Sequence, residues 1–395
     1  MSSGSRSPTD DGAEHIRLLP LSDVRVVALE HAVAAPLCSR HLADLGADVV
    51  KVERAAGDFA RGYDSVARGQ SAYFVWLNRG KRSVALELGR PDDRAMLDAL
   101  LARADVFVHN LGPGAVDRLG LGWSAVHSRW PRLISCGISG YGTTGPLRER
   151  KAYDLLLQAE SGLLAVTGTP DEMAKVGVSI ADIASAMYAL TSILAALALR
   201  ERTGEGTAVD VAMLDCLAEW MSVPAYYQIH AGAPPARTGT RHSTIVPYGP
   251  YRTGDGGSVC LAVQNDPQWR RLCEVVLRRP ELVADARFLT NELRLRNRDI
   301  LEPLIEAALG ADTVSSATAR LEAADVPFGA VNDVAGLVAH AQLAARGRWV
   351  EDDSPGGPVR VLREPFDLDA APRARRRVPA LGEHTDELRR ELGLA

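Results

Sequence analysis

Short β-branched runs alternate with segments of helical spacing in the first half of the chain. A run at Val24–Leu29 (VRVVAL) predicts a strand, Ala35–Leu45 carries apolar residues at helical spacing, and Ala47–Val52 (ADVVKV) predicts a second strand. A strand, a helix and a strand in this order form a βαβ unit with parallel strands.

The same alternation continues along the chain. Further strands are predicted at Ser83–Glu87, Val106–Val108 and Leu133–Gly137, with a helix over Asp92–Arg103. A series of this kind is typical of a parallel sheet with helices on its faces. The fold class is therefore expected to be α/β.

The pattern changes in the second half. Gly, Pro and Thr are concentrated in Ala231–Gly257, which indicates a domain boundary or an ordered active-site loop. The remaining predicted elements are helices over Asp182–Arg202 and Val211–Ser222, a strand over Ser258–Val263, a mostly helical segment over Pro267–Ala323, a strand over Val359–Leu362 and a helix over Thr385–Leu392.

These elements suggest four regions. Residues 1–15 are rich in Ser, Gly, Asp and Pro without an apolar stretch, and are expected to be a disordered tail rather than a signal peptide. Residues 16–224 are expected to form a large domain, 225–330 a small domain, and 331–395 a segment that returns to the large domain.

Composition narrows the possible partners. A formal net charge of -5 argues against nucleic-acid binding and against a membrane-surface protein, so a phosphorylated ligand would need a local basic pocket. Ile183–Leu199 carries no charge and approaches the length of a membrane span. Because it is rich in alanine and is interrupted by Ser and Thr, a buried core helix is expected instead.

The cysteines indicate a reducing compartment. All 5 are widely spaced without a C-x-x-C pair, so neither a disulfide framework nor a zinc site is expected, and we predict a cytoplasmic protein without a bound metal. The first predicted βα turn, His31–Pro36, reads HAVAAP rather than G-x-G-x-x-G, which argues against a nicotinamide cofactor.

Eight short pieces of sequence occur in a recognisable order. They are His31–Pro36 (HAVAAP), Leu45–Arg54 (LGADVVKVER), Leu77–Arg82 (LNRGKR), Asn110–Gly114 (NLGPG), Gly140–Gly142 (GYG), Thr167–Asp171 (TGTPD), Asp182 and Arg202–Gly206 (RTGEG). In this order and approximate spacing they resemble the class III CoA-transferases, the family of formyl-CoA and carnitine CoA-transferases that also contains 2-methylacyl-CoA racemases. The resemblance implies a Rossmann-like large domain, a smaller α+β domain, an interlocked homodimer and coenzyme A as acyl-CoA substrate.

The resemblance assigns the chemistry to Asp171. It implies that this carboxylate attacks the acyl-CoA thioester to give a mixed anhydride and then an aspartyl-CoA thioester, which the incoming carboxylate opens. A mixed anhydride keeps the energy of the thioester, provided water is excluded. A Pro-Asp pair is also common in solvated turns, and only the surrounding family pattern favours the catalytic role.

The resemblance also implies a set of binding residues. Backbone donors to the oxyanion are expected at Val33, Ala34, Tyr141 and Gly142. Contacts with CoA are expected at His31, Ala32, Arg54, Leu77, Asn78, Arg79, Gly80, Asn110, Leu111, Gly112, Arg118, Ser139 and Gly140. Arg54 and Arg118 would meet the CoA phosphates, whereas Lys81 and Arg82 could equally be solvated surface charges.

Two departures from the family bear on the acceptor. Ser139 stands where formyl-CoA transferases have a lysine nearby, and Thr238–Tyr248 replaces their glycine-rich lid. The replacing loop resembles that of members using C4 or C5 dicarboxylic acids. Arg237, Arg241 and His242 could therefore bind a second carboxylate, unless the loop is only a basic surface loop. Succinyl-CoA is one candidate donor.

Two alternative functions are compatible with parts of the same pattern. A racemase of this family carries a His-Asp pair where this chain has Tyr153 and Asp154, with a partner aspartate at Asp182. Tyrosine cannot replace a histidine that titrates near neutral pH, so the racemase ranks second, and Asp182 is expected to cap the long helix. A non-catalytic CoA-binding protein would be expected to lose the Asp171 carboxylate.

Overall fold

A computed structural model of the chain describes residues 19–368 and 376–394. The chain divides into two compact units, here called the first and the second unit. The first comprises Met1–Lys151, Asp182–Met213 and Gly347–Ala395, and the second comprises Ala152–Ala181 and Leu214–Arg346. Residues 152–181 thus group with the second unit rather than with a continuous large domain, and the predicted tail at 1–15 lies outside the described residues.

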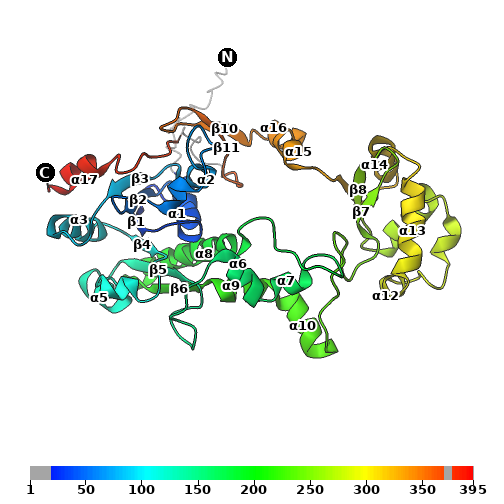
Figure 1. Cartoon of the computed structure of the whole chain (residues 1–395), viewed down its shortest axis with the longest axis horizontal. Coiled ribbons are helices and arrows are strands. Elements are labelled where there is room, and N and C mark those ends of the chain that lie inside the picture. The colour runs from blue at the N-terminus through cyan, green and yellow to red at the C-terminus, as the bar shows by residue number, and fades with distance from the viewer. Residues whose placement is uncertain (1–18, 369–375, 395) are drawn as a thin grey trace, which may run out of the picture. The chain divides into compact units, whose positions relative to one another are not determined.

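The first unit contains a six-stranded parallel sheet, which confirms the α/β prediction (Figure 1). The strand order is β3-β2-β1-β4-β5-β6. The strands are β1 (Arg25–Leu29), β2 (Asp48–Glu53), β3 (Arg82–Ala85), β4 (Val106–His109), β5 (Ile134–Ser139) and β6 (Ala208–Ala212). Because the chain order reverses between β1 and β4, a crevice is expected beyond the carboxyl ends of these two strands.

Helices cover this sheet, and apolar side chains fill the space between. Buried Val27, Val50 and Phe107 of the strands pack with Leu97 of α3 and Leu388 of α17. The helices are α1 (Ala34–Asp44), η1 (Phe59–Gly62), α2 (Ala72–Asn78), α3 (Pro91–Leu101), α4 (Ala115–Arg118), α5 (Trp123–Arg129), α8 (Ile180–Thr203) and α17 (Thr385–Leu392). A two-stranded hairpin, β10 (Trp349–Asp352) and β11 (Val359–Leu362), completes the unit.

Strand β6 was missed by the sequence prediction, which placed a helix over Val211–Ser222. Residues 208–212 pair with β5 as strand β6, and the helix α9 (Met213–Trp220) begins only at the next residue. Just before β6, a Cβ on Gly206 would lie 2.2 Å from the carbonyl oxygen of Leu133. Glycine at this position therefore lets the chain approach the sheet closely enough to add the last strand.

The second unit is α+β. Its three-stranded antiparallel sheet has the order β7-β8-β9, with β7 at Tyr248–Arg252, β8 at Ser258–Ala262 and β9 at Phe328–Ala330. A separate apolar core includes Trp269, Phe288 and Leu301. The helices are α6 (Asp154–Glu160), α7 (Leu163–Val166), α10 (Ser222–Ala231), α11 (Asp266–Arg271), η2 (Leu272–Val276), η3 (Pro280–Val283), α12 (Asn291–Arg296), α13 (Arg298–Leu309), α14 (Val314–Ala323), α15 (Val334–Val338) and α16 (Ala341–Ala345).

Helix α8 is long and apolar enough to cross a membrane by length and composition alone. Half of its apolar window is buried inside the chain, as is typical of a core helix. In its last turn the buried Arg200 forms an ion pair of 3.0 Å with Asp105. These contacts agree with the predicted core helix.

Candidate functional site

An asparagine joins the two loops at the switch point of the sheet. Asn110 follows β4 and His31 lies two residues beyond β1. The Oδ1 atom of Asn110 accepts a hydrogen bond of 3.0 Å from the His31 backbone N–H, and its Nδ2 donates one of 2.8 Å to the His31 carbonyl. One side chain thus fixes the two loops that flank the place where open α/β sheets bind ligands.

The next residues turn sharply into α1. Ala32 has a φ of 61°, in the left-handed region, and its N–H donates to Oδ1 of Asp58 at 3.2 Å. Val33 is the N-cap of α1, and no side chain in the described part of the chain caps this helix. The uncapped first turn, including Val33 and Ala34, leaves backbone donors suited to an anionic group.

Buried charges lie beneath this loop. Lys51 forms an ion pair of 2.9 Å with Asp58, and Lys81 forms one of 2.6 Å with Glu30. Burial raises the pKa of the Glu30 carboxyl, but Lys81 and Lys51 outweigh it and leave this pKa below its ordinary value. Burial lowers the pKa of Lys81 to about 8. Lys81 is therefore a structural cation rather than a surface contact for CoA.

The side chains at the end of α2 lie in the core of the first unit. Leu77 and Asn78 are fully buried and Arg79 is 2% exposed. The Arg79 guanidinium lies 3.7 Å from Asp44 and 3.8 Å from Asp352. These side chains therefore pack against neighbouring elements, and the contacts with CoA expected from this segment stay a prediction. The adjoining Gly80 donates its N–H to the carbonyl of Arg377 at 2.8 Å.

Two of the predicted phosphate contacts remain at the surface of the first unit. Arg54, just after β2, and Arg118, in α4, are exposed, as is Gly112 between Leu111 and Pro113. Within the described residues, the guanidinium groups of the two arginines donate to nearby carbonyl oxygens, that of Gly57 at 3.1 Å for Arg54 and that of Pro113 at 3.4 Å for Arg118. Both follow the carboxyl ends of strands, as a CoA-binding crevice there requires.

The loop after β5 is held by its own polar groups. The Gly142 N–H donates to Oγ of Ser139 at 3.0 Å, and Gly142 has a φ of 83°. To donate to the oxyanion, as predicted, the Gly142 N–H would have to break its hydrogen bond with Ser139. Beside it, the Tyr141 ring lies 5.7 Å from the guanidinium carbon of Arg150.

This loop also contains a misleading glycine pattern. Gly140–Gly145 reads GYGTTG and has the G-x-G-x-x-G spacing, although the turn after β1 does not, so the expectation that this pattern occurs nowhere in the chain was wrong. In dinucleotide-binding folds this pattern opens a helix whose N-terminus holds the pyrophosphate. Here turns and extended residues follow, and the next helix, α6, begins only at Asp154.

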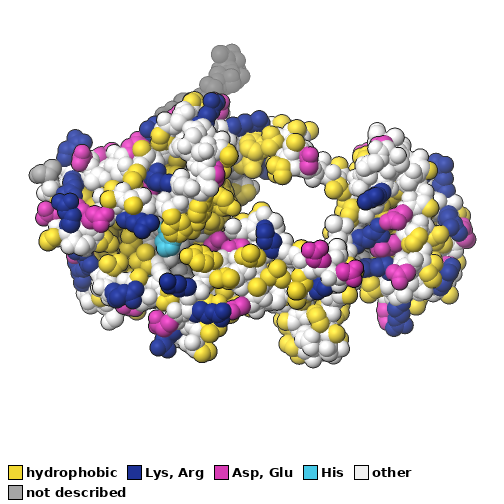
Figure 2. Space-filling view, viewed as in Figure 1, with side chains coloured by type: hydrophobic (Ala, Val, Ile, Leu, Met, Phe, Trp, Pro, Cys, Tyr) yellow, Lys and Arg dark blue, Asp and Glu magenta, His cyan; other side chains and the backbone are white. Residues whose placement is uncertain are grey.

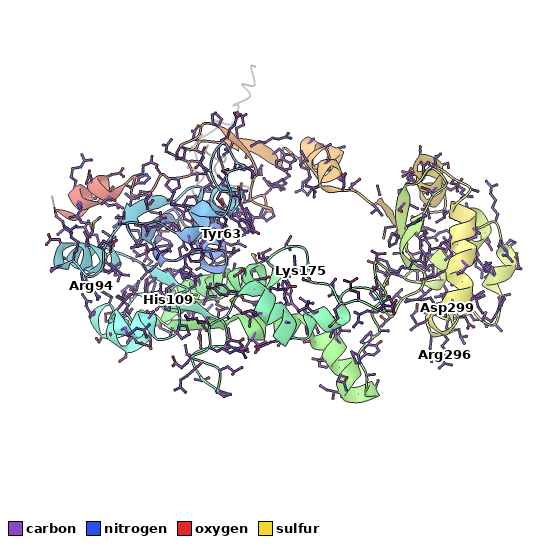
Figure 3. All side chains as sticks on the ribbon, viewed as in Figure 1. Tyr63, Arg94, His109, Lys175, Arg296 and Asp299 are labelled. Carbon is purple, nitrogen blue, oxygen red and sulfur yellow. The ribbon has the colours of Figure 1, made fainter. Side chains whose placement is uncertain are left out.

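His109, the last residue of β4, was not identified from the sequence (Figure 3). Its Nδ1 atom is buried without a hydrogen-bond partner among the described residues. Burial lowers the pKa of the imidazole to about 4, which makes it neutral at neutral pH. A Cβ on Gly137 would lie 2.9 Å from His109 Cε1, so glycine in β5 makes room for this ring. Its only signal in the sequence is its position beside Asn110.

Asp171 lies in the second unit, at the tip of a tight hairpin formed by Thr167–Ala174, here called the Asp171 hairpin. Gly168 and Met173 form a bridge, and the Ala174 N–H donates to the Thr167 carbonyl at 2.9 Å. Gly168 has a φ of 113°, and a Cβ there would lie 2.2 Å from the Glu172 carbonyl oxygen. The Asp171 side chain is exposed and accepts no hydrogen bond from the described part of the chain.

The three residues predicted to bind an acceptor carboxylate each contact a different part of the chain. Arg237 donates to three backbone carbonyls of α7 and of the Asp171 hairpin. Arg241 forms ion pairs with Glu302 and Glu306. The His242 ring stacks on Tyr248 with ring centroids 5.0 Å apart. Only Arg237 therefore contacts the segment that carries Asp171.

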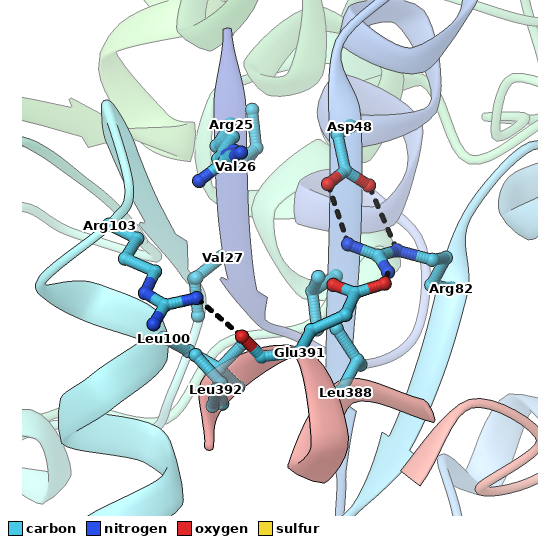
Figure 4. Close-up of a pocket in the computed structure, with 11 residues that line it drawn as sticks. Arg25, Val26, Val27, Asp48, Arg82, Leu100, Arg103, Leu388, Glu391 and Leu392 are labelled. Atoms are coloured by element: carbon cyan, nitrogen blue, oxygen red, sulfur yellow. Dashed lines mark hydrogen bonds and ion pairs between the residues drawn. The ribbon is translucent and has the colours of Figure 1, made fainter. Parts of the chain in front are cut away.

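The first unit has a cavity at the amino ends of its parallel strands. It has a volume of about 620 Å³ and is lined by the first residues of three strands, Arg25, Asp48 and Arg82, and by residues of α3 and α17 (Figure 4). Arg82 pairs there with Asp48 at 2.6 Å and with Glu391 at 2.8 Å, which docks the C-terminal helix. This cavity lies at the strand ends opposite those that His31 and Asn110 follow.

A second cavity, of about 380 Å³, lies in the second unit. Its lining includes Thr238, Thr244 and Arg298, so it adjoins the loop that carries Arg237. No group of three or more metal-ligating side chains was found among residues 19–368 and 376–394.

Comparison with known proteins places this geometry in a family. The family model for CoA-transferase family III matches residues 21–385. A succinate–glutarate CoA-transferase of Agrobacterium fabrum is 35% identical over 94% of this chain and 96% of its own length. A succinyl-CoA:mesaconate CoA-transferase of Haloarcula hispanica is 35% identical over 95% of this chain and 96% of its own length.

A solved structure agrees. The crystal structure of a CAIB/BAIF family protein from Brucella suis superposes with a TM-score of 0.83 at 36% identity, covering 95% of this chain and all of that one. The match spans both compact units and the order of motifs from His31 to Gly206. The chain therefore belongs to CoA-transferase family III and is a CoA-transferase.

Proposed function

We propose that the enzyme transfers CoA from succinyl-CoA, or a similar acyl-CoA, to a C4 or C5 dicarboxylate through covalent intermediates on Asp171. The proposal is supported by the exposed Asp171 carboxylate at the tip of a hairpin that the Gly168–Met173 bridge closes. It is also supported by the similarity of the chain to glutarate and mesaconate CoA-transferases. A carboxylate without an internal partner is available to act as a nucleophile.

The proposed reaction needs no co-reactant. An oxygen of Asp171 attacks the thioester carbonyl carbon, the C–S bond breaks, and CoA thiolate leaves behind a mixed anhydride. The thiolate then attacks the Asp171 carbonyl carbon, which releases the donor carboxylate and leaves an aspartyl-CoA thioester. The acceptor carboxylate displaces the thiolate to form a second anhydride. Attack of the thiolate on the acceptor's acyl carbon restores Asp171.

The residues of the crevice have complementary tasks in this scheme. Arg54 and Arg118 would bind CoA phosphates, and the uncapped start of α1 would supply donors to charge that develops on the thioester oxygen. The neutral His109 and the amide of Asn110 lie at the same strand ends. These groups are in the first unit, whereas Asp171 is in the second.

Water must be excluded from the anhydride, yet Asp171 is exposed in the single chain. We propose that a homodimer supplies the cover. Helices α10, α15 and α16 contain no buried residue, and apolar side chains on them are widely exposed, such as Ile229 at 68% and Val334 at 76%. Hydrophobic side chains gather on the surface over α15 and α16 (Figure 2). Such surface is typical of an assembly interface.

The racemase alternative is weakened by the contacts of its candidate bases. Both carboxylate oxygens of Asp154 accept hydrogen bonds of 2.7 Å, from the Ala181 N–H and from Nε2 of Gln158. Asp154 thereby caps the start of α8, whose first residue is Ile180, so the prediction that Asp182 is the N-cap was wrong. Tyr153 is 68% exposed.

A donor and acceptor panel tests the proposed function. Succinyl-CoA and acetyl-CoA are each incubated with glutarate, mesaconate, itaconate, citramalate, succinate, oxalate and formate, and product acyl-CoA is measured by mass spectrometry. The proposal expects transfer with a C4 or C5 dicarboxylate to exceed that with formate at least tenfold in kcat/KM. Transfer only to formate or oxalate would contradict the acceptor assignment. Exchange of an α-proton in deuterium oxide without transfer would favour the racemase.

A further inference from the structure

Arg237 is bound to the backbone that carries the nucleophile. Its Nε donates to the Thr169 carbonyl at 2.8 Å, its Nη2 to the Pro170 carbonyl at 2.8 Å, and its Nη1 to the Ala165 carbonyl at 3.1 Å. All three guanidinium nitrogens are therefore engaged with neutral backbone acceptors. Three of the five N–H donors of the guanidinium are thereby used within the chain, including those of Nε and Nη2, which lie on one edge of the planar group, so fewer donors remain for bidentate binding of a substrate carboxylate.

The identity of the bound carbonyls matters for Asp171. The Pro170 carbonyl belongs to the peptide whose nitrogen is that of Asp171, and the Thr169 carbonyl belongs to the peptide before it. Because peptide units are planar and the φ of proline is nearly fixed, holding both oxygens fixes the position of the Asp171 Cα and so restricts where its side chain can lie. The third bond, to Ala165, anchors the same group to the C-terminal part of α7.

A second contact holds the same strand of the hairpin. The N–H of Gly239, two residues after Arg237, donates to the Gly168 carbonyl at 2.8 Å. The loop at Arg237–Gly239 therefore binds three successive carbonyls, those of Gly168, Thr169 and Pro170. No side chain of the described residues forms a hydrogen bond with Asp171 itself. The contacts from Arg237 and Gly239 are therefore the main restraint that residues outside the hairpin place on the nucleophile.

We propose that Arg237 is a positioning residue that holds the Asp171 carboxylate in its attacking orientation, and that it does not bind the acceptor. The inference rests on the proposed function of Asp171 as nucleophile. A lysine could replace the charge but not the planar fork, because an ammonium group on a flexible stem cannot span carbonyls on two consecutive peptides and on α7 at once.

The test uses the full-length enzyme and the first half-reaction, with acyl-CoA alone. Wild type, Arg237→Lys and Arg237→Met are mixed with succinyl-CoA, quenched in hydroxylamine, and the hydroxamate on Asp171 is followed over time. At saturating acyl-CoA we expect the labelling rate constant to fall about 100-fold in Arg237→Met and about 10-fold in Arg237→Lys, as for a nucleophile displaced by about 1 Å. The acyl-CoA concentration for half-maximal rate should change less than threefold.

Controls separate this role from the others. Arg252→Met, an exposed arginine at the end of β7, should label at the wild-type rate, and urea unfolding should show that each variant is folded. A wild-type labelling rate in Arg237→Met, with a raised KM only for the acceptor, would overturn the positioning role and restore a substrate-binding one. If the wild-type enzyme transfers CoA but no hydroxamate forms on Asp171, the proposed function itself is contradicted.

Discussion

Asn110 holds His31 by both ends of one amide group, accepting from its N–H at 3.0 Å and donating to its carbonyl at 2.8 Å. The pair joins the loops after β4 and β1 at the point where the strand order of the sheet reverses. The shape of the CoA crevice should therefore depend on a side chain that carries no charge.

Asn110→Ala tests this dependence. Loss of two hydrogen bonds of about 1 kcal/mol each should weaken CoA binding roughly tenfold or more, as measured by calorimetry. Asn110→Asp keeps the size but cannot donate to the His31 carbonyl, and should lose at least as much. Asn332→Ala, at an exposed position of the second unit, serves as the control. Unchanged CoA affinity in a folded Asn110→Ala enzyme would contradict the role of the pair.

His109 predicts a pH dependence of stability. Its folded-state pKa, about 4, lies below the ordinary 6.5, so the unfolded chain binds a proton that the folded chain does not. Stability from this group is present above pH 6.5 and is lost as the pH falls toward 4. Between pH 7.5 and pH 5 the loss should be about 2 kcal/mol.

Urea unfolding at the two pH values measures this contribution. His109→Asn should reduce the wild-type loss of unfolding free energy by about 2 kcal/mol. His230→Asn, which changes an exposed histidine at the end of α10, should leave the loss as it is. Equal losses in wild type and His109→Asn would show that His109 is accessible to protons in the folded enzyme.

The fold was largely predictable because its signals are local. Runs such as Val24–Leu29 reveal a buried strand without reference to the rest of the chain. Strand β6 carries a weaker signal, with only Val209 and Val211 as β-branched residues, and its state is decided by pairing with β5, more than sixty residues earlier. The sequence prediction therefore extended the following helix backwards into it.

The site was predictable only in part, for the same reason. The loop residues His31, Arg54 and Asn110 follow strand ends, which sequence patterns locate. The cluster LNRGKR at Leu77–Arg82 suggested surface cations, yet the partner of Lys81 is Glu30, 51 positions away. The partners of Arg237 are 67, 68 and 72 positions away, so its contact with the Asp171 hairpin could not be derived from neighbouring residues.

Lys81 should matter for stability rather than for CoA. Lys81→Met would leave Glu30 buried with one of its two cations removed, which should cost about 3–5 kcal/mol of unfolding free energy. Lys175→Met removes an exposed lysine of the second unit and should cost little (Figure 3). Urea titration of both variants at pH 7 compares them. A loss below 1 kcal/mol for Lys81→Met would contradict the network.

Gly168 should be required for the Asp171 hairpin. Gly168→Ala places a Cβ against the Glu172 carbonyl at a φ of 113°, so the hairpin must distort, and kcat should fall about 100-fold with CoA affinity unchanged. Gly177→Ala is the matched control, because a Cβ there meets nothing within 4 Å. Steady-state kinetics and calorimetry with CoA separate the two effects. Normal kcat in Gly168→Ala would show that the hairpin geometry is not needed.

The central claim is that Asp171 carries the transferred group. Wild type, Asp171→Ala and the neighbouring control Glu172→Gln are incubated with succinyl-CoA, treated with hydroxylamine and digested, and the peptide containing Thr167–Ala174 is sequenced by mass spectrometry. The account predicts a hydroxamate on Asp171 in wild type and Glu172→Gln, none in Asp171→Ala, and at least a 1,000-fold loss of transfer in that variant, on the order expected for removal of a covalent nucleophile. Normal transfer by Asp171→Ala, or a hydroxamate on a different carboxylate, would contradict it.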